Sequence, residues 1–416
     1  MEPLSLFTTN KERKWFFSLI LLIFTLNVSF HYFNYQTFIK NEVFATTGTI
    51  VNIYSKKNYD VLKINTDTLT FFTSIPKQNT LKKFDQIHSY IITKNIDFFS
   101  YLKGFYTKSF NIHKISTTHI STKERLYNLI ALQHKNTEIS SLYGALYLAT
   151  PLERQTRELS GNLGISHLIA ISGFHLGVMS FVLYFFIYLI YNKIHQKYIP
   201  YRNKRFDTMI FIVVILFIYL LFLDSPPSLL RAFFMFVFAL YLLRNNIKVL
   251  SFETLFLITI TIVAFFPKLL FSLSLWFSIS GVFYIFLFIH YFKNLNKYLQ
   301  ILFFNFWIYF AMNPITHYFF GVLSFEQLFS PLLTLLFSIF YPLSVLLHIF
   351  NIGYLFDDLL QYLLDLNIYT QEVFTPTWLF YTFIILSLFS TLNTRGFIVL
   401  NIIIVAFNLW LFHFIF

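Results

Sequence analysis

The run TMIFIVVILFIYLLFL occupies residues 208–223 and contains no charged side chain. Residues 270–292 form a second long apolar stretch with no charge near its centre. Of the 416 residues, 56% are hydrophobic, 22% are aromatic and only 12% are charged, whereas soluble proteins carry about 25% charged residues. The composition therefore predicts a lipid bilayer as the environment of this chain, and it excludes a soluble enzyme, a disordered protein and a fibre.

The remaining charge is strongly unbalanced, because 31 Lys and Arg face 19 Asp and Glu and give a net charge of +12. Such an excess belongs in loops or in domains outside the membrane, and it favours anionic partners. The sequence has no cysteine, which rules out disulfides, thiolate metal sites and cysteine catalysis.

The first apolar run, residues 15–33, follows the basic residues Lys11, Arg13 and Lys14. This positive flank, and the absence of a small-residue cleavage site, predict a retained transmembrane anchor over residues 1–37 that begins in the cytoplasm. Residues 126–165 are expected to form amphipathic connecting helices. The polytopic region, 166–416, contains nine candidate spans at 166–191, 208–223, 228–243, 250–266, 270–291, 298–313, 326–350, 377–392 and 397–416. The predicted fold is a polytopic α-helical membrane protein of about ten transmembrane helices.

Basic loops assign the cytoplasmic side of the membrane. Five basic residues fall between Lys193 and Arg205, and later loops contain Arg244, Lys248, Lys293, Lys297 and Arg395. On this rule residues 224–227 lie outside, and the spans alternate in direction up to residue 313. The alternation then fails unless residues 351–372 lie flat, as an interfacial helix with Asp358, Gln361 and Asp365 on one face would. The side of the C-terminus stays open.

Residues 38–125 differ from the rest of the chain because they are polar, rich in lysine and broken into short β-type runs. The candidate strands are 43–54, 59–65, 69–74 and 86–93, separated by turn residues at 56–58, 66–67 and 76–80. These strands suit a small all-β barrel of the OB type, although a sandwich would satisfy the same pattern. Because it follows the anchor, this domain is expected to be extracytoplasmic.

Over half of the net charge lies in this β-domain, where 13 Lys and Arg face 6 Asp and Glu. A surface with this charge attracts polyanions. A solvated face of a lysine-rich protein would have the same composition, so both interpretations stay open.

The segment Ser166-His-Leu-Ile-Ala-Ile-Ser-Gly-Phe-His-Leu-Gly177 contains the chain's most informative polar residues. Gly173 and Gly177 form a G-x-x-x-G pattern, which lets another helix approach closely. The pattern does not explain His175, which is expected about two turns inside a span, where an ionisable side chain is costly. Ser172 lies on nearly the same side. A polar site lining a passage, a hydrogen-bonded core histidine and a catalytic Ser/His pair all remain possible for this segment, which also contains His167.

A second polar constellation is Asp224-Ser-Pro-Pro-Ser-Leu-Leu-Arg231. The prolines end one helix, and Ser228 can cap the next, whose first turn carries Arg231. A guanidinium at the outer mouth of the membrane would bind phosphate, whereas an arginine that only snorkels to the interface would need no ligand.

Later helices carry further small and polar side chains. Ser274, Ser278 and Gly281 share one face of the span that begins at 270, and this stripe suits either helix packing or a pore wall. Asn313 and His317 flank Pro314, where a broken helix would line a cavity or be buried. No Asp or Glu lies near the centre of a candidate span. Because proton-coupled and sodium-coupled carriers usually need such a carboxylate, the sequence favours a passage for an anion.

The motifs that hold metals or nucleotides are missing from the sequence. It contains no H-E-x-x-H, its twelve histidines show no ligand spacing, and Gly161-Asn-Leu-Gly164 lacks the Gly-Lys-Ser/Thr ending of a phosphate loop. We therefore expect no metal and no cofactor. Two alternative functions are a small-solute (anion) transporter and an intramembrane hydrolase or transferase that uses Ser172 and His175.

The run from His167 to Gly177 closely resembles the motif of ComEC-type competence proteins, the inner-membrane channels for DNA uptake in natural transformation. Further landmarks follow in the family's order, namely residues 225–232, 267–278 and 313–343. Upstream, residues 97–104 resemble the end of the family's OB-like domain. The resemblance covers roughly residues 30–400.

The resemblance implies a multi-pass channel in the bacterial inner membrane that imports one DNA strand while its complement is degraded outside. The expected path residues are His167, Ser172, Gly173, His175, Gly177, Arg231, Ser274, Ser278, Asn313 and His317. The expected external DNA-binding residues are Lys56, Lys57, Lys63, Lys82, Lys83 and Lys103. Many relatives carry a metallo-β-lactamase-like domain, whereas this sequence has no H-x-H-x-D-H run. We therefore expect no enzymatic activity. The expected partners are single-stranded DNA, membrane lipid, a periplasmic DNA receptor, a separate nuclease and cytoplasmic single-strand-binding or motor proteins.

Overall fold

The computed structural model describes residues 7, 9–66, 68–77, 81–115, 122–245, 247 and 250–414. Asp67, residues 78–80, Lys248 and the last two residues of the final predicted span lie outside these ranges. The chain divides into two compact units. One contains Phe7–Asn128 and Thr259–Leu275, and the other contains Leu129–Ile258 and Trp276–Phe416.

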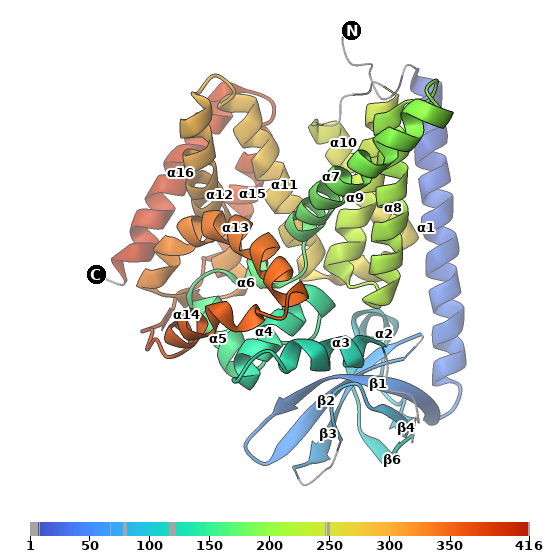
Figure 1. The fold of residues 1–416 in the computed structure, drawn as a ribbon. Helices are drawn as coiled ribbons and strands as arrows, with labels where there is room; N and C mark the ends of the chain where they lie inside the picture. Colours follow the sequence, from blue (N-terminus) through green and yellow to red (C-terminus); the bar gives the residue numbers. More distant parts are fainter. Residues whose placement is uncertain are drawn as a thin grey trace. The chain divides into compact units, whose positions relative to one another are not determined.

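The first unit contains a six-stranded mixed sheet (Figure 1). Its first four strands agree closely with the prediction: β1 (Val43–Ser55), β2 (Tyr59–Asn65), β3 (Thr70–Pro76) and β4 (Gln86–Ile92). The sequence analysis missed α2 (Phe98–Lys103), β5 (Phe105–Tyr106) and β6 (Ser109–Lys114). Both missed strands are short, and neither alternates cleanly between buried and exposed residues.

The strands of this sheet lie in the order β5-β3-β2-β1-β4-β6. β1 pairs with β4 over its first half and with β2 over its second half, and β2 continues to β3. β5 lies parallel to β3, and β6 lies antiparallel to β4. Between them, the backbone N–H of Thr107 donates to Phe72 O at 2.9 Å and its hydroxyl donates to Ile92 O at 2.6 Å. Thr107, which lies between β5 and β6 in the chain, therefore links β3 to the end of β4.

The long strand β1 changes partners at a glycine. A Cβ on Gly48 would lie 2.7 Å from Ile64 Cγ2 and 2.9 Å from Asn65 O. Only glycine lets β2 approach β1 this closely where the strand turns from β4 to β2.

Helix α1 (Asn10–Ile39) ends in the core of the sheet. Thr9 caps the helix by accepting from Glu12 N–H at 3.2 Å, and its 30 residues span about 45 Å. At the other end, Phe38 is 1% exposed and the Tyr35 hydroxyl donates to Ile96 O at 2.9 Å. A loop from the later part of the chain joins this unit, because Lys268 Nζ donates to Thr68 O at 2.7 Å.

The second unit is helical. Its elements are α4 (Thr137–Leu148), α5 (Arg154–Asn162), α6 (Ser166–Ile169), α7 (Gly173–Tyr198), α8 (Lys204–Phe222), α9 (Pro227–Arg244), α12 (Lys297–Phe319), α13 (Ser330–Ile349), α14 (Asp357–Leu364), α15 (Thr377–Phe389) and α16 (Thr394–His413). The helices α3 (Thr122–Ala131), α10 (Phe252–Phe265) and α11 (Leu273–Tyr291) contribute residues to both units.

Six helices in the described part of the chain are long and apolar enough to cross a membrane. They are Asn10–Ile39, Gly173–Tyr198, Lys204–Phe222, Leu273–Tyr291, Phe325–Ile349 and Thr394–His413. The protein is therefore a mostly helical, multi-pass membrane protein. The single span predicted at 166–191 is wrong, because the chain breaks between α6 and α7 and Ser172 becomes the N-cap of α7.

The segment that contains α13 and α14 begins and ends at a small two-stranded sheet. β7 (Val322–Leu323), which follows α12, pairs with β8 (Gln371–Glu372), which precedes α15. Near the start of α13, Ser324 Oγ donates to Asn162 O at 2.5 Å, and near its end the Tyr147 hydroxyl donates to Ser344 Oγ at 2.7 Å. Both ends of α13 therefore contact the α4–α5 region. We expect α13 to re-emerge on the side of the membrane from which it enters, which would restore the alternation of spans that fails after residue 313.

The return can be tested by cysteine labelling in the cysteine-free chain. Phe320 and Tyr369 flank the returning segment and are 53% and 75% exposed, whereas Tyr298 and Leu392, at the other ends of α12 and α15, are 83% and 75% exposed. Single cysteines at 320 and 369 should react with an impermeant maleimide from one side of the membrane, and those at 298 and 392 from the other. Labelling of 320 and 369 from opposite sides would show that α13 crosses the membrane.

Candidate functional site

Ser172 and His175 lie together in the first turn of α7, not deep inside a span. Ser172 is the N-cap and His175 is the third residue of the helix, the arrangement of a capping box. His175 Nδ1 accepts from the backbone N–H of Ser172 at 3.2 Å and lies 3.3 Å from the Ser172 hydroxyl. Because Nδ1 accepts, neutral His175 carries its hydrogen on Nε2.

Aromatic side chains of α7 and α13 enclose His175. Its ring centroid lies 4.5 Å from that of Tyr341 and 5.7 Å from that of Phe337, in edge-on contacts, and Phe174 packs against both aromatic rings. His175 is 0% exposed, and its Nε2 has no hydrogen-bond partner among the described residues. The imidazole is therefore held dry beneath α13.

The structure brings α9 close to this turn. A Cβ on Gly173 would lie 3.8 Å from the Cβ of Ala232, whereas a Cβ on Gly177 would meet nothing within 4 Å. Arg231, the neighbour of Ala232, is 6% exposed. The first turns of α7 and α9 thus bring His175 and Arg231 into the same region, while His167 on α6 is exposed.

Asn313 and His317 serve to hold α12 to its neighbours. Pro314 has no N–H for the carbonyl of Phe310, four residues earlier, and Asn408 Nδ2 of α16 donates to that carbonyl at 3.0 Å. Asn313 Nδ2 donates to Asn408 Oδ1 at 2.7 Å and so orients the amide. His317 Nδ1 lies 3.1 Å from Val373 O. These contacts satisfy the polar groups at the proline.

The other predicted residues are spread over several elements. Ser274 and Ser278 lie on α11, where Ser274 is exposed and Ser278 is half-buried. Lys56 and Lys57 lie in the turn between β1 and β2, and Lys82 and Lys83 lie between β3 and β4. Lys63 lies 5.9 Å from the centroid of the Phe72 ring, and Lys103, at the end of α2, lies 5.2 Å from that of Phe271.

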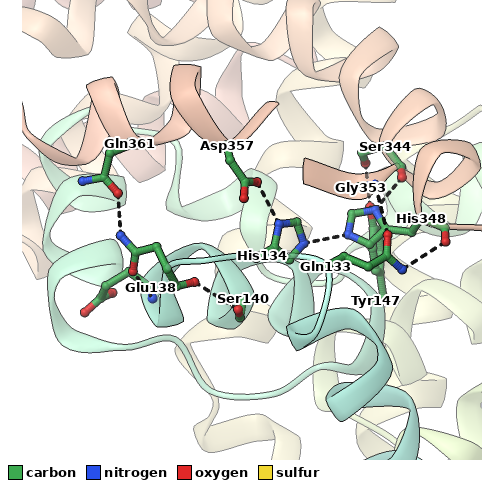
Figure 2. Close-up of polar contacts among 11 residues, drawn as sticks. Gln133, His134, Glu138, Ser140, Tyr147, Ser344, His348, Gly353, Asp357 and Gln361 are labelled. Atoms are coloured by element: carbon green, nitrogen blue, oxygen red, sulfur yellow. Dashed lines mark hydrogen bonds and ion pairs between the residues drawn. The ribbon is translucent and has the colours of Figure 1, made fainter. Parts of the chain in front are cut away.

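A polar cluster that the sequence analysis missed joins α13 and α14 to the turn before α4 (Figure 2). His134 Nδ1 lies 2.7 Å from Asp357 Oδ1, and His134 Nε2 lies 2.9 Å from His348 Nε2. Gln133 Oε1 accepts from Gly353 N–H at 3.0 Å, and Gln133 Nε2 donates to His348 O at 3.2 Å. The cluster fixes the far end of α13.

Sequence spacing gave no signal for this cluster, because 214 positions separate His134 from His348. The helix predicted within 351–372 was the nearest clue. It forms as the short α14, and Gln361 Oε1 of this helix accepts from Asn136 Nδ2 at 2.5 Å. No group of three His, Cys, Asp or Glu side chains among the described residues is arranged to hold a metal ion.

The fold and this site define a multi-pass membrane protein with a buried histidine and a buried arginine at neighbouring helix starts. The model of the family described as Competence protein matches residues 149–415, and the chain belongs to this family, in its ComEC type. No curated protein and no solved structure matches the chain.

The role of Asn408 at Pro314 can be tested by a double-mutant cycle. Asn408→Leu leaves the Phe310 carbonyl without its side-chain donor, so it should lower the free energy of unfolding by about 1–3 kcal/mol. In a Pro314→Ala background the restored backbone N–H takes over, so the same substitution should cost clearly less. Thermal unfolding in detergent measures both.

Asn401 of α16 provides the matched control. It accepts from Trp307 Nε1 at 2.8 Å and has no contact with the proline turn. The cost of Asn401→Leu should therefore be unchanged by Pro314→Ala. If Asn408→Leu lowered the free energy of unfolding equally in both backgrounds, Asn408 would not be replacing the hydrogen bond that Pro314 removes.

Proposed function

We propose that this protein is an inner-membrane channel that imports single-stranded DNA during natural transformation. Membership of the competence family over residues 149–415 is the observation that carries the proposal. The buried Arg231 beside the first turn of α7 supports it, because a guanidinium in a dry site binds phosphate strongly. We propose that α9, α10, α12 and α15 cross the membrane in addition to α1, α7, α8, α11 and α16. The ten predicted spans then become nine crossings, because α13 is proposed to return to the side from which it enters.

The sheet of the first unit is proposed to be an OB-like, extracytoplasmic domain over residues 38–125 that receives DNA. Its six-stranded mixed sheet and its net charge of +7 support this role. Its outer face also offers aromatic rings, since Tyr90 and Phe110 stack with centroids 5.7 Å apart and planes 15° apart. Phe110 is 47% exposed. Single strands bind where basic side chains accompany such rings, because nucleobases stack on them.

Within the membrane, Arg231 and His175 are the proposed contacts to the incoming strand, with Ser172 as a neutral donor. An enzyme at this site is disfavoured, because His175 Nδ1 already accepts the backbone N–H of Ser172. We propose that a periplasmic receptor, a separate nuclease and cytoplasmic single-strand-binding or motor proteins complete the process.

Uptake of labelled duplex DNA tests the channel. Cells that lack the gene should still bind DNA outside but accumulate no protected single strands. Arg231→Ala should lower internalised strand by about tenfold or more, since the loss of one charge-assisted hydrogen bond exceeds about 1.4 kcal/mol.

Arg244→Ala, at the other end of the same helix, is the matched control and should leave uptake near the parent level. Normal accumulation of protected single strands in cells that lack the gene would contradict the proposal. Uptake of a small anion that is lost together with Arg231 would favour a solute transporter instead.

Binding of a single-stranded oligonucleotide to the full chain in detergent tests the β-domain. Lys56, Lys57 and Lys82 are exposed, so their substitution by Gln should flatten the slope of log affinity against log salt by about 2, at about 0.7 per phosphate contact. The triple control Lys193, Lys293 and Lys297→Gln, in the basic loops of the helical unit, should leave the slope unchanged. Equal changes in both variants would show that the β-domain is not the binding surface.

A further inference from the structure

Helix α13 covers the histidine of the competence motif. Phe337 and Tyr341 of α13 lie over His175, which is 0% exposed. A DNA strand that contacts His175 must therefore displace these two rings. The covered arrangement is a closed one, and α13 is the element that closes it.

The two ends of α13 are attached differently. At the start, the Ser330 hydroxyl donates to Gly164 O at 3.0 Å, a contact without a titratable group. At the far end, the histidine pair His134–His348 joins α13 to the turn before α4, and Asp357 extends the pair to α14 (Figure 2). The far end therefore carries two histidines, whereas the titratable group nearest the start is the carboxylate of Glu326.

The hydrogen bonds of this far end fix the number of protons that it can hold. His348 Nδ1 lies 2.7 Å from Ser344 O, a carbonyl that can only accept, so Nδ1 carries a hydrogen. Neutral His348 then has a bare Nε2, which accepts the Nε2–H of His134. The remaining contact, His134 Nδ1 to Asp357 Oδ1, contains a single shared proton.

One more proton breaks this arrangement. Protonation of His348 Nε2 would place two N–H groups head to head across the 2.9 Å that separates the histidine nitrogens. The groups that face the pair cannot relieve the conflict: Tyr143 and Tyr147 lie on α4, Asp357 lies on α14, and Tyr341 lies on α13 itself. Burial raises the pKa of Tyr143 and Tyr147, so both stay neutral and take up no proton.

We propose that α13 is a movable cover over the DNA passage, held shut by the pair His134–His348 and released when His348 gains a proton. This inference rests on the proposed function and assigns a regulation to the same site. The closed form persists while His348 Nε2 carries no hydrogen and while His134 and Asp357 retain their shared proton. Acidification opens the cover, because charged His348 repels His134.

A reversible lock tests the movement. Gln133 Nε2 lies 3.4 Å from Asn351 Oδ1 across the cover's attachment. In the cysteine-free chain, Gln133→Cys with Asn351→Cys can be joined by a short bifunctional methanethiosulfonate and released by a reductant. Import of labelled DNA should stop on joining and return on reduction.

The matched control joins two cysteines within one helix. Arg154 and Glu158 form an ion pair on successive turns of α5, so a link between cysteines at these positions holds no second element. It should leave import unchanged. Normal DNA import by the protein with the cysteines at 133 and 351 joined would contradict the claim that α13 must move. Absence of import in the reduced pair and in the parent would instead remove the channel function.

The pH-dependent release of α13 at the pair His134–His348 can be tested without measuring DNA import. Phe174→Cys lies beneath α13, and its labelling by a soluble thiol reagent should quicken several-fold between about pH 7.5 and about pH 4.5. The range extends well below the ordinary histidine pKa of about 6.5 because burial lowers the pKa of His348. The rate is normalised to Leu132→Cys, a position that is 83% exposed. His348→Gln should abolish the pH dependence. Labelling that is equally slow at both pH values would contradict the release of α13 by protonation of His348.

A glycine beside the pair His134–His348 supplies an independent opening variant. A Cβ on Gly353 would lie 2.7 Å from Gln133 Oε1 and 2.8 Å from His348 Nε2. Gly353→Ala should therefore push Gln133 and His348 away from each other and weaken the attachment of α13. Labelling of Phe174→Cys should then be faster at the higher pH. Gly281→Ala, where a Cβ meets nothing within 4 Å, should have no effect. Equal labelling rates of Phe174→Cys in the Gly353→Ala and Gly281→Ala variants would show that Gly353→Ala does not separate His348 from His134.

Discussion

A polar backbone group inside a bilayer must find its partner within the protein, and this constraint organises the whole helical unit. The chain breaks its helices before α7 and between α12 and α13, and Pro314 removes one backbone hydrogen bond inside the continuous helix α12. At each interruption a buried side chain satisfies the backbone. His175 accepts from Ser172, Asn408 donates to Phe310, and Ser330 donates to Gly164. The polar residues of the membrane region are therefore concentrated where helices break.

The same residues create the site. Because α7 begins at Ser172, His175 lies near the start of a helix, where it can meet the first turn of α9 and Arg231. Because the chain returns from β7 to β8, α13 packs over that turn with Phe337 and Tyr341. The family match covers all of these elements. A closed, buried site at the start of two helices suits the proposed passage, which opens when α13 moves away from His175.

Periodicity and charge predicted much of the fold. The first four strands, the anchor and most long helices were expected close to their observed positions, since each depends on local alternation or on a long apolar run. The strands β5 and β6 were missed because both are short and each pairs with a strand that is not its neighbour in the chain, β5 with β3 and β6 with β4. The break before α7 was missed because Ser172 caps the helix within an otherwise continuous apolar run.

The site was predicted only in part. His175 and Arg231 stood out because charged or ionisable side chains are costly near a membrane. Asn313 and His317 were expected along the passage, whereas their observed partners are Asn408 and Val373 O, which hold α12 in place. The pair His134–His348 could not be anticipated, since no spacing rule connects residues brought together by the return of α13.

A structure of the full chain with a single-stranded oligonucleotide bound tests the central claim most directly. The account predicts phosphates at Arg231 and His175, with Phe337 and Tyr341 displaced from the imidazole. A strand that passes elsewhere, while the Tyr341 ring still lies about 4.5 Å from that of His175, would contradict it.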